Sequence, residues 1–292
     1  MIRHEGTLYR PPSEAQSLIL QATIGCSYNR CTFCGMYRDK RFRVRPLAEL
    51  TAEIAWAAAH VPGVRKVFLA DGDALVAKSS FLEALLDELS AAFPHLARVS
   101  VYASPQSLQV RTVEEMARLR EKGLSLYYLG IESGHDQVLA ALEKGVDAAE
   151  MVRVAGKASE AGVKLSTMVL LGAGGRKLSQ EHARASAQVV NAIQPRFVST
   201  LVVTPVPGTP LWDEAQLGQV EELDPLELAA ELRTFLAGLE LRATVFRSNH
   251  ASNYLSLAGN LPRDREALLE TLDAVLADPR AARFTPDRLR GL

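Results

Sequence analysis

Residues 17–35 read SLILQATIGCSYNRCTFCG, an apolar segment followed by a short loop that holds every cysteine of the chain. Ser17–Thr23 has the apolar composition and the length of a buried strand. Cys26, Cys31 and Cys34 then fall within nine residues. Three cysteines are an odd number, and they lie too close together for a disulfide framework. Clustered thiolates directly after a strand indicate a metal or iron–sulfur site.

Strand and helix patterns alternate outward from this segment. The expected strands are residues 17–23, 66–70, 98–103, 124–131, 163–171, 197–203 and 243–246. The expected helices are residues 47–60, 80–93, 112–122, 150–160, 179–193, 221–239 and 264–276. Strands that alternate with helices pair in parallel. We therefore predict an α/β fold, a partial or complete (β/α) TIM-type barrel with mostly parallel strands and a C-terminal strand–helix extension.

Length and charge limit the class of protein. The 292 residues carry 33 Lys+Arg and 34 Asp+Glu, a net charge of −1, which lacks the basic excess typical of proteins that grip nucleic acid. We expect an N-terminal segment at 1–16, a barrel core at 17–212, and C-terminal helices and a strand at 213–292 that complete or cover the barrel. No apolar run reaches the roughly 18 residues of a membrane span, and the N-terminus lacks the apolar region of a secretory signal. We expect a cytoplasmic protein without a membrane partner.

The cysteine loop has two chemical interpretations. Three thiolates can ligate three irons of a [4Fe–4S] cluster, and because the chain has no fourth cysteine, one iron stays open to a small molecule. An open coordination position is typical of catalytic metal sites. The alternative is a Cys3His zinc site, but none of the six histidines has zinc-knuckle spacing. The spacing favours the iron–sulfur cluster.

The loop resembles that of the radical S-adenosylmethionine (SAM) superfamily, and the resemblance runs from about Leu18 to about Pro210. The two-residue second interval and Phe33 before the last cysteine match the family pattern. The first interval holds four residues, Ser27 to Arg30, where the family usually has three, so the loop is an atypical CX4CX2C. The resemblance implies that the three cysteines hold a [4Fe–4S] cluster whose open iron binds SAM.

Polar or glycine-rich segments follow the later strands, and the resemblance gives them roles in binding SAM. Gly72 would allow close backbone approach, and Asp73 would accept a hydrogen bond from the methionine ammonium group. The cofactor-binding residues implied in this way are Phe33, Gly72, Asp73, Ser104, Glu132, Ser133, Gly172 and Thr204. Each also fits a purely structural role, such as an Asx turn or a helix cap. Their order at successive strand ends favours the functional interpretation.

The resemblance implies an oxidoreductase-type radical reaction. A single cluster would cleave SAM reductively to methionine and a 5′-deoxyadenosyl radical, which abstracts hydrogen from a small-molecule substrate. The reaction would need an external one-electron donor such as flavodoxin or ferredoxin. Two alternatives remain open: a radical SAM enzyme that modifies RNA, and a non-catalytic iron–sulfur electron carrier.

Two further stretches are candidates for substrate contact. Tyr37–Arg45 carries five basic residues and could hold an anion or touch RNA, or it could be a solvated loop. Arg247–Tyr254 gathers hydrogen-bonding side chains after the last expected strand. His250 in this stretch is our candidate catalytic residue, as a proton donor or substrate clamp. A histidine in a loop can equally be a structural hydrogen-bonding group.

Overall fold

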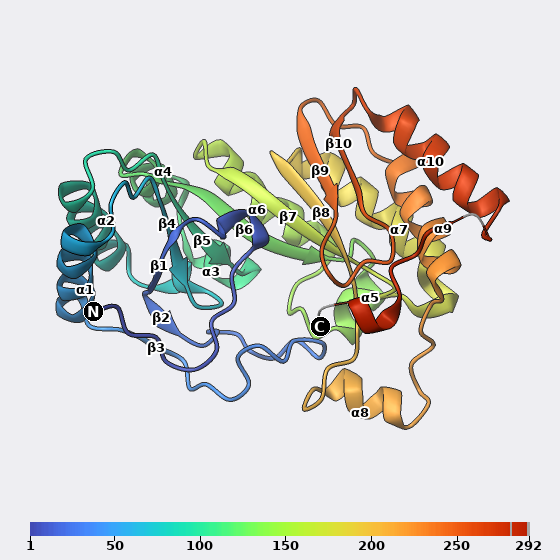
Figure 1. Cartoon of the computed structure of the whole chain (residues 1–292), viewed down its shortest axis with the longest axis horizontal. Coiled ribbons are helices and arrows are strands. Elements are labelled where there is room, and N and C mark those ends of the chain that lie inside the picture. The colour runs from blue at the N-terminus through green and yellow to red at the C-terminus, as the bar shows by residue number, and fades with distance from the viewer. Residues whose placement is uncertain (281, 291–292) are drawn as a thin grey trace. The chain divides into compact units, whose positions relative to one another are not determined.

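The computed structural model describes residues 1–280 and 282–290, and these residues form two compact units (Figure 1). The first unit comprises Met1–Asn29, Met36–Leu129 and Val154–Leu165. The second comprises Arg30–Gly35, Gly130–Arg153 and the chain from Ser166 onward. Among the described residues, no helix is both long enough and apolar enough to cross a membrane.

The first unit is built on parallel strands in the order β1–β4–β5–β6 (Figure 1). Their bounds are β1 (Leu18–Gln21), β4 (Lys66–Ala70), β5 (Arg98–Ala103) and β6 (Leu124–Glu132), with β6 in this unit as far as Leu129. Leu18 is in register with Val67. Leu20, Phe68 and Val101 are completely buried and form part of the core. A separate antiparallel pair, β2 (Thr23–Ile24) and β3 (Arg43–Val44), flanks the start of the cysteine loop.

Helices follow the strands of the first unit, as the alternating pattern predicts. They are α1 (Leu47–His60), α2 (Ser79–Ala92), α3 (Pro105–Val110), α4 (Val113–Glu121) and the end of α6 (Ala148–Glu160), with short 3-10 turns η1 (Pro12–Glu14) and η2 (Ala74–Val76). Helix α2 contacts both α1 and α4. Leu50, Ile54 and Ala57 recur at helical spacing on α1 and are buried, so this face of α1 packs onto the core.

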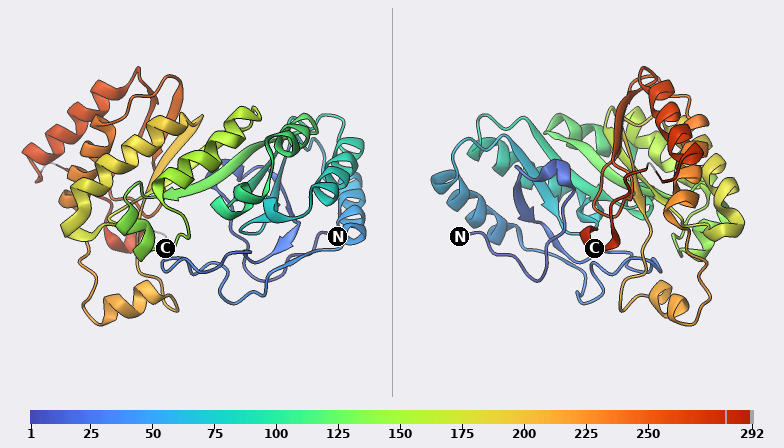
Figure 2. Two further views of the ribbon diagram at one scale, coloured as in Figure 1. Left: turned by 180° about the vertical axis from the view of Figure 1, so that it is seen from behind. Right: turned by 45° about the vertical axis from the view of Figure 1, so that its right-hand side comes forward.

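The second unit has the strand order β7–β8–β9–β10. Its strands are β7 (Lys164–Leu171), in this unit from Ser166, β8 (Phe197–Val202), β9 (Thr244–Ser248) and β10 (Leu257–Leu261). The first three are parallel, and β10 runs antiparallel to β9. Its helices are α5 (Asp136–Ala141), the start of α6, α7 (Gly175–Ile193), α8 (Pro210–Gln216), α9 (Pro225–Ala237) and α10 (Arg265–Ala277), followed by η3 (Asp287–Leu289). Helix α9 contacts both α7 and α10, as the two views of Figure 2 show.

The predicted α/β class with mostly parallel strands is confirmed, with several local differences. The strand expected at 17–23 is divided into β1 and β2, the helix expected at 179–193 already begins at Gly175, and α5, α8 and β3 were not predicted. The helix expected at 221–239 begins only at Pro225, because the Asp224 side chain accepts the first backbone N–H groups and caps it there. Residues 104–107, expected in a loop, open helix α3 with a capping box. Strand β10 was not predicted; its sequence LAGNL carries Gly259 and Asn260, which both disfavour strands.

Candidate active site

The three cysteines are thiols without a disulfide, and each is partly exposed. Cys26 belongs to the first unit, and Cys31 and Cys34 belong to the second. In the second unit, the Cys34 N–H donates to the Cys31 carbonyl over 3.2 Å, which makes a tight turn between the two thiols. Thr32 anchors this turn, because its N–H donates to the Leu142 carbonyl over 3.1 Å.

Two buried carboxylates that follow β4 hold the chain on either side of Cys26. Asp71 Oδ2 accepts the Gly25 N–H over 2.9 Å. Asp73 Oδ2 accepts the Ser27 hydroxyl. Both carboxylates are completely buried. The residues before and after Cys26 are therefore both fixed by the segment that follows β4.

Gly72 lies between these carboxylates in a place where no larger residue fits. A Cβ at this position would lie 2.4 Å from Cε2 of the buried Tyr37 and 3.0 Å from the Cβ of Cys26. Asp73 also accepts the Ser104 N–H over 3.1 Å and the Ser104 hydroxyl over 2.7 Å. Burial raises the pKa of Asp73, although these hydroxyl donors oppose the shift. Gly72, Asp73 and Ser104 thus form one hydrogen-bonded and packed group around Cys26.

The basic stretch Tyr37–Arg45 is largely tied to carboxylates of the first unit. Three of its five basic residues form ion pairs: Lys40 with Asp71, Arg43 with Glu5, and Arg45 with Glu53. The first and third of these pairs are buried. These three cations hold the stretch against its own unit.

The end of β6 carries a buried ion pair in the second unit. Lys144 Nζ lies 2.8 Å from Glu132 Oε1. Burial works against the charged lysine, but the Glu132 carboxylate and the Cys31 thiol outweigh it and raise the pKa of Lys144. Glu132 has a φ of 64°, and its carboxylate folds back over Gly130, where a Cβ would lie 1.9 Å from Oε1. A side chain at position 130 would therefore displace the Glu132 carboxylate from this position.

Ser133, the next residue, bonds to a histidine that the sequence analysis did not single out. Its Oγ lies 2.7 Å from Nδ1 of His182 on α7, and both side chains are completely buried. His182 Nε2 lies 3.0 Å from the Leu170 carbonyl, which can only accept, so Nε2 carries the proton and Nδ1 accepts from Ser133. Burial lowers the pKa of His182 to about 4, so the ring is neutral at pH 7.

Gly172, which directly follows β7, is held by the buried side chain of Glu231. Its N–H donates to Glu231 Oε1 of α9 over 2.7 Å, while Ser179 of α7 donates to Oε2 over 2.6 Å. Burial raises the pKa of Glu231 to about 7. Glu231 Oε1 lies 3.7 Å from Nε2 of His182. Because the His182 ring is neutral at pH 7, the two side chains do not form an ion pair.

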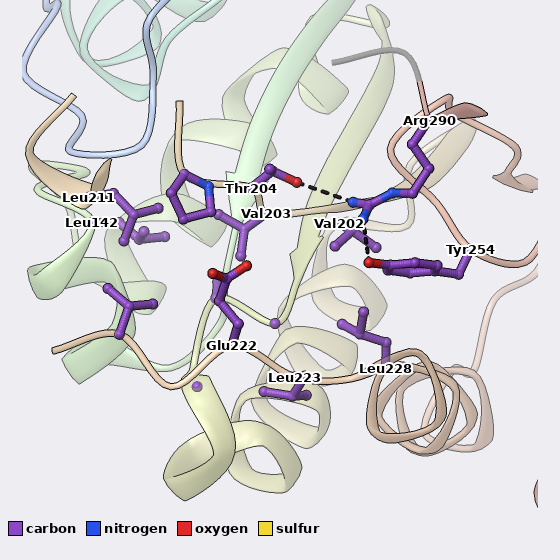
Figure 3. A pocket seen from close by; sticks show the side chains of 15 residues that line it. Leu142, Val202, Val203, Thr204, Leu211, Glu222, Leu223, Leu228, Tyr254 and Arg290 are labelled. Atoms are coloured by element: carbon purple, nitrogen blue, oxygen red, sulfur yellow. Dashed lines mark hydrogen bonds between the residues drawn. The ribbon is translucent and has the colours of Figure 1, made fainter. Parts of the chain in front are cut away.

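A pocket of about 70 Å³ opens beside Gly172 and Thr204 in the second unit (Figure 3). Its walls come from the ends of β7 and β8, from Val220, Glu222 and Leu223 before α9, and from Tyr254 and Arg290. Thr204 accepts a hydrogen bond from Arg290 Nη2 over 3.2 Å. Two of the predicted cofactor-binding residues, Gly172 and Thr204, therefore line one cavity.

His250 lies in a half-buried turn after β9. Its Nδ1 accepts the Ser252 N–H over 3.1 Å, and burial lowers its pKa. Ser252 Oγ and Asn253 Oδ1 in turn accept the Val202 N–H at 3.1 and 2.9 Å. The hydrogen bonds of this turn thus support the carboxyl end of β8.

The predicted residues fall into three groups. Gly72, Asp73 and Ser104 surround Cys26 in the first unit; Phe33, Glu132 and Ser133 belong with Cys31 and Cys34 to the second unit; Gly172 and Thr204 line its pocket. Sequence reasoning missed Lys144, His182, Glu231 and Arg290. Glu231 could have been noticed, because it lies between Leu228 and Leu232 on the buried face of an amphipathic helix, where an ionisable residue needs a partner.

No group of three or more His, Cys, Asp or Glu side chains within residues 1–280 and 282–290 is arranged to hold a metal ion. The donor set nevertheless fits an iron–sulfur cluster. Thiolates are the usual protein ligands of such clusters, and all three cysteines are reduced, partly exposed and within one nine-residue stretch. Cys26 is held from both sides, and the other two thiols share one anchored turn.

Polar groups at the carboxyl ends of parallel strands, together with a loop of thiols, define an α/β enzyme of the iron–sulfur type. The sequence model of the radical SAM superfamily matches residues 20–184, more than half of the chain. The chain belongs to the radical SAM superfamily. Members of this superfamily use a [4Fe–4S] cluster and SAM, and they need an electron donor.

Curated relatives resemble the chain in sequence, and solved structures resemble it in fold. The tRNA-2-methylthio-N(6)-dimethylallyladenosine synthase of Aromatoleum aromaticum is 28% identical over 246 residues, covering 80% of this chain and 52% of the relative. The chain thus spans about half the length of the curated relatives it matches. Methylornithine synthase superposes with a TM-score of 0.57 at 16% identity, covering 92% of this chain and 74% of that one. Coproporphyrinogen III oxidase from Escherichia coli, a radical SAM enzyme, gives 0.57 at 18%, covering 76% and 52%. These two structures share the fold.

Proposed function

We propose that this protein is a radical SAM enzyme that uses a single [4Fe–4S] cluster and acts on a small-molecule substrate. The observation that carries the proposal is the fixation of Cys26 by the two buried carboxylates after β4. Asp71 binds the residue before this cysteine and Asp73 binds the residue after it. Two buried carboxylates that bind the residues on either side of Cys26 fix the position of its thiol, as a metal-binding or catalytic site requires.

Cys26, Cys31 and Cys34 would hold the cluster, and this chain supplies thiols for one such cluster. When bound, the cluster and SAM supply a 5′-deoxyadenosyl radical that abstracts hydrogen from the substrate. Gly72 leaves the backbone after β4 open to close approach, and Ser104 and Asp73 fix that segment. Phe33, Glu132, Ser133, Gly172 and Thr204 are the remaining proposed cofactor contacts.

The charge distribution supports a small molecule over a nucleic acid. Non-specific affinity for RNA comes chiefly from cations that are available to phosphates. In the first unit, Lys40, Arg43 and Arg45 are already paired with carboxylates, two of these pairs being buried. The net charge of −1 adds no general attraction to a polyanion.

RNA modification is the second candidate function, because the curated relatives are named as enzymes of a tRNA modification. We expect tRNA binding, if it occurs, to weaken steeply as salt rises, since each phosphate contact releases counterions. Measuring the affinity for tRNA at two salt concentrations, with heparin as a non-specific polyanion for comparison, separates the two candidates. Salt-dependent binding of tRNA that heparin does not displace would favour this second candidate.

The direct test is anaerobic reconstitution with iron and sulfide, followed by reduction with dithionite in the presence of SAM. Paramagnetic resonance of the cluster and chromatography of 5′-deoxyadenosine are read on the same sample. We expect SAM to change the cluster signal and deoxyadenosine to form. Cys26→Ser, Cys31→Ser and Cys34→Ser should each abolish both signals, while Ser80→Ala, far from the loop in sequence, serves as control. A cluster that neither responds to SAM nor cleaves it would favour an iron–sulfur electron carrier.

His250 is proposed as a proton donor or substrate clamp, and comparing His250→Gln with the wild type tests this role. His250→Gln keeps a hydrogen-bonding side chain at that position but removes the titrating ring. Deoxyadenosine formation and product formation are followed separately. Unchanged rates of both would leave the residue with the structural role of supporting Ser252 and the end of β8.

Three further features stay proposals. We propose a flavodoxin or ferredoxin as electron donor, because all three cysteines lie in one loop and this chain has no thiols for a relay cluster. A cytoplasmic location and a division of the chain after residues 16 and 212 remain predictions from the sequence.

A further inference from the structure

The pocket of the second unit is apolar except at two points. Val202, Leu223 and Leu228 contribute apolar walls. Of the residues that line it, Glu222 is the one carboxylate and Arg290 is the one cation. Figure 3 shows the Glu222 carboxylate rising into the pocket and the Arg290 side chain entering from the C-terminal segment. A ligand in this space therefore meets one negative and one positive group.

Within the described part of the chain, the Arg290 side chain is held in place by four hydrogen bonds, which leave one of its N–H groups available. Its side chain is 7% exposed, and its guanidinium lies over the Tyr254 ring at 4.0 Å. Its N–H groups donate to the Ser252 carbonyl, the Tyr254 hydroxyl, Asp287 and Thr204. A guanidinium has five N–H donors, so one N–H on Nη2 has no partner among the described residues.

Thr204 completes an anion site beside this N–H. Its Oγ1 accepts from Arg290 over 3.2 Å, so its own hydroxyl proton is directed elsewhere. The spare Nη2–H and this hydroxyl give two adjacent donors. Two donors of which one belongs to a fixed guanidinium suit a carboxylate oxygen.

Glu222 is available to a cation. Across residues 1–280 and 282–290 it forms no hydrogen bond and no ion pair, Arg290 included. Its neighbour Glu221 is instead paired with Lys177 at 3.5 Å. Glu222 is exposed to solvent at the edge of the pocket, so its carboxylate can pair with an ammonium group that enters the pocket, in a weak and solvent-screened ion pair.

The pocket adjoins the turn that holds two of the cysteines. Leu142 and Leu211 both line it. The Leu142 carbonyl accepts from the Thr32 N–H, and the Leu211 N–H donates to the Thr32 carbonyl, each over 3.1 Å. Thr32 follows Cys31 directly, so a ligand in the pocket lies next to the backbone of the proposed cluster loop.

We propose that this pocket binds the substrate through an amino-acid-type zwitterion, with its carboxylate at Arg290 and Thr204 and its ammonium group at Glu222. The inference rests on the proposed function, because it assigns the pocket to the substrate of that reaction, and it moves Gly172 and Thr204 from cofactor contacts to substrate contacts. A cavity needs roughly 10–15 Å³ of space to hold one water, so a volume of about 70 Å³ has room for several heavy atoms. It therefore fits the amino-acid end of a ligand or a small amino acid.

The test uses the reconstituted full chain under anaerobic conditions, with the twenty protein amino acids as probes in ligand-observed NMR. We expect at least one amino acid to bind. For the tightest binder, the matched analogue that lacks the carboxyl group should bind about tenfold more weakly or worse, since it loses a charge-assisted hydrogen bond to the buried Arg290. The analogue that lacks the amino group should bind about two- to fivefold more weakly, since its partner Glu222 is exposed. Equal binding of either analogue, or no binding of any amino acid, would overturn the assignment.

Matched variants locate the site. Thr204→Val should weaken binding by about tenfold. Glu222→Gln should weaken it by about two- to fivefold, because Glu222 is exposed and solvent screens its ion pair, whereas Glu221→Gln should not change it. Unchanged affinity in both pocket variants, with folding verified by circular dichroism, would overturn the proposal.

SAM itself carries an amino-acid end, so the titration is repeated with SAM at saturation. Retained amino-acid binding supports a separate substrate site, and displacement by SAM would overturn it in favour of a cofactor site. Deoxyadenosine formation on the same samples tests the proposed function independently. Cleavage of SAM without any amino-acid binding would refute only the substrate class, and binding without cleavage would refute only the radical reaction.

Discussion

The buried Glu231 should make the free energy of unfolding depend on pH. Its side chain is completely buried, and burial raises its pKa from 4.5 to about 7. Between these values the unfolded chain releases the proton while the folded protein keeps it. The unfolding free energy contributed by this group is therefore fully present below pH 4.5 and is lost as pH rises through about 7.

The size of the effect follows from the shift. Each pKa unit corresponds to about 1.4 kcal/mol, so the total loss of unfolding free energy is about 3 kcal/mol. Most of this loss, about 2–3 kcal/mol, occurs as the pH rises from 5 to 8. Glu231→Gln stays neutral and removes this dependence. Its amide oxygen can accept from the Gly172 N–H and its amide nitrogen can donate to the Ser179 hydroxyl, so both hydrogen bonds are kept at every pH. His182 is neutral throughout this range and does not change charge.

The assay is urea unfolding of the reconstituted protein at pH 5, 6, 7 and 8, under anaerobic conditions. We expect the stability of the variant relative to the wild type to rise steadily from pH 5 to pH 8. Glu270→Gln, an exposed substitution on α10, controls for effects of pH on the cluster. A difference between Glu231→Gln and the wild type that stays constant with pH would refute the reasoning.

Three further substitutions test a buried ion pair and the packing at two glycines. Lys144→Met leaves the buried Glu132 carboxylate without its partner and should destabilise the fold by about 3–5 kcal/mol; an unchanged urea midpoint would show that the carboxylate is solvated. A Cβ at Gly134 would lie 2.1 Å from the Ala185 carbonyl oxygen, so Gly134→Ala should lower the melting temperature and the unfolding free energy by at least about 1–3 kcal/mol. Gly156 on α6 has no atom near that position, so Gly156→Ala should instead raise the unfolding free energy by up to about 1 kcal/mol.

Much of the fold could be predicted because local patterns decide it. The apolar run at 66–70 and the amphipathic pattern at 47–60 have the same bounds as β4 and α1. These elements have strong periodicity and clear boundaries, such as Pro46 before the helix. Strand β10 was missed because its sequence is weak on its own and it forms only by antiparallel pairing with β9.

The candidate site was predictable only in part. The cysteine loop stands out because thiol chemistry depends on residue type and spacing, which are properties of the sequence. Residue type and spacing could not predict the contact between Asp73 and Ser104. Their carboxylate and hydroxyl bind each other across 31 positions of the chain, and the same residue types occur in ordinary turns.

By itself, the sequence determined the family-type cysteine loop, the alternation of strands and helices, and the residues available at strand ends. The tertiary structure decided which of these residues meet. Glu231 reaches Gly172 across 59 positions, Ser133 reaches His182 across 49, and Arg290 reaches Thr204 across 86. Such contacts leave no local signature because each pair is brought together by the packing of α7, α9 and the C-terminal segment on the strands. Burial then sets the charges: a carboxylate or an imidazole acquires its shifted pKa only when folding removes it from water.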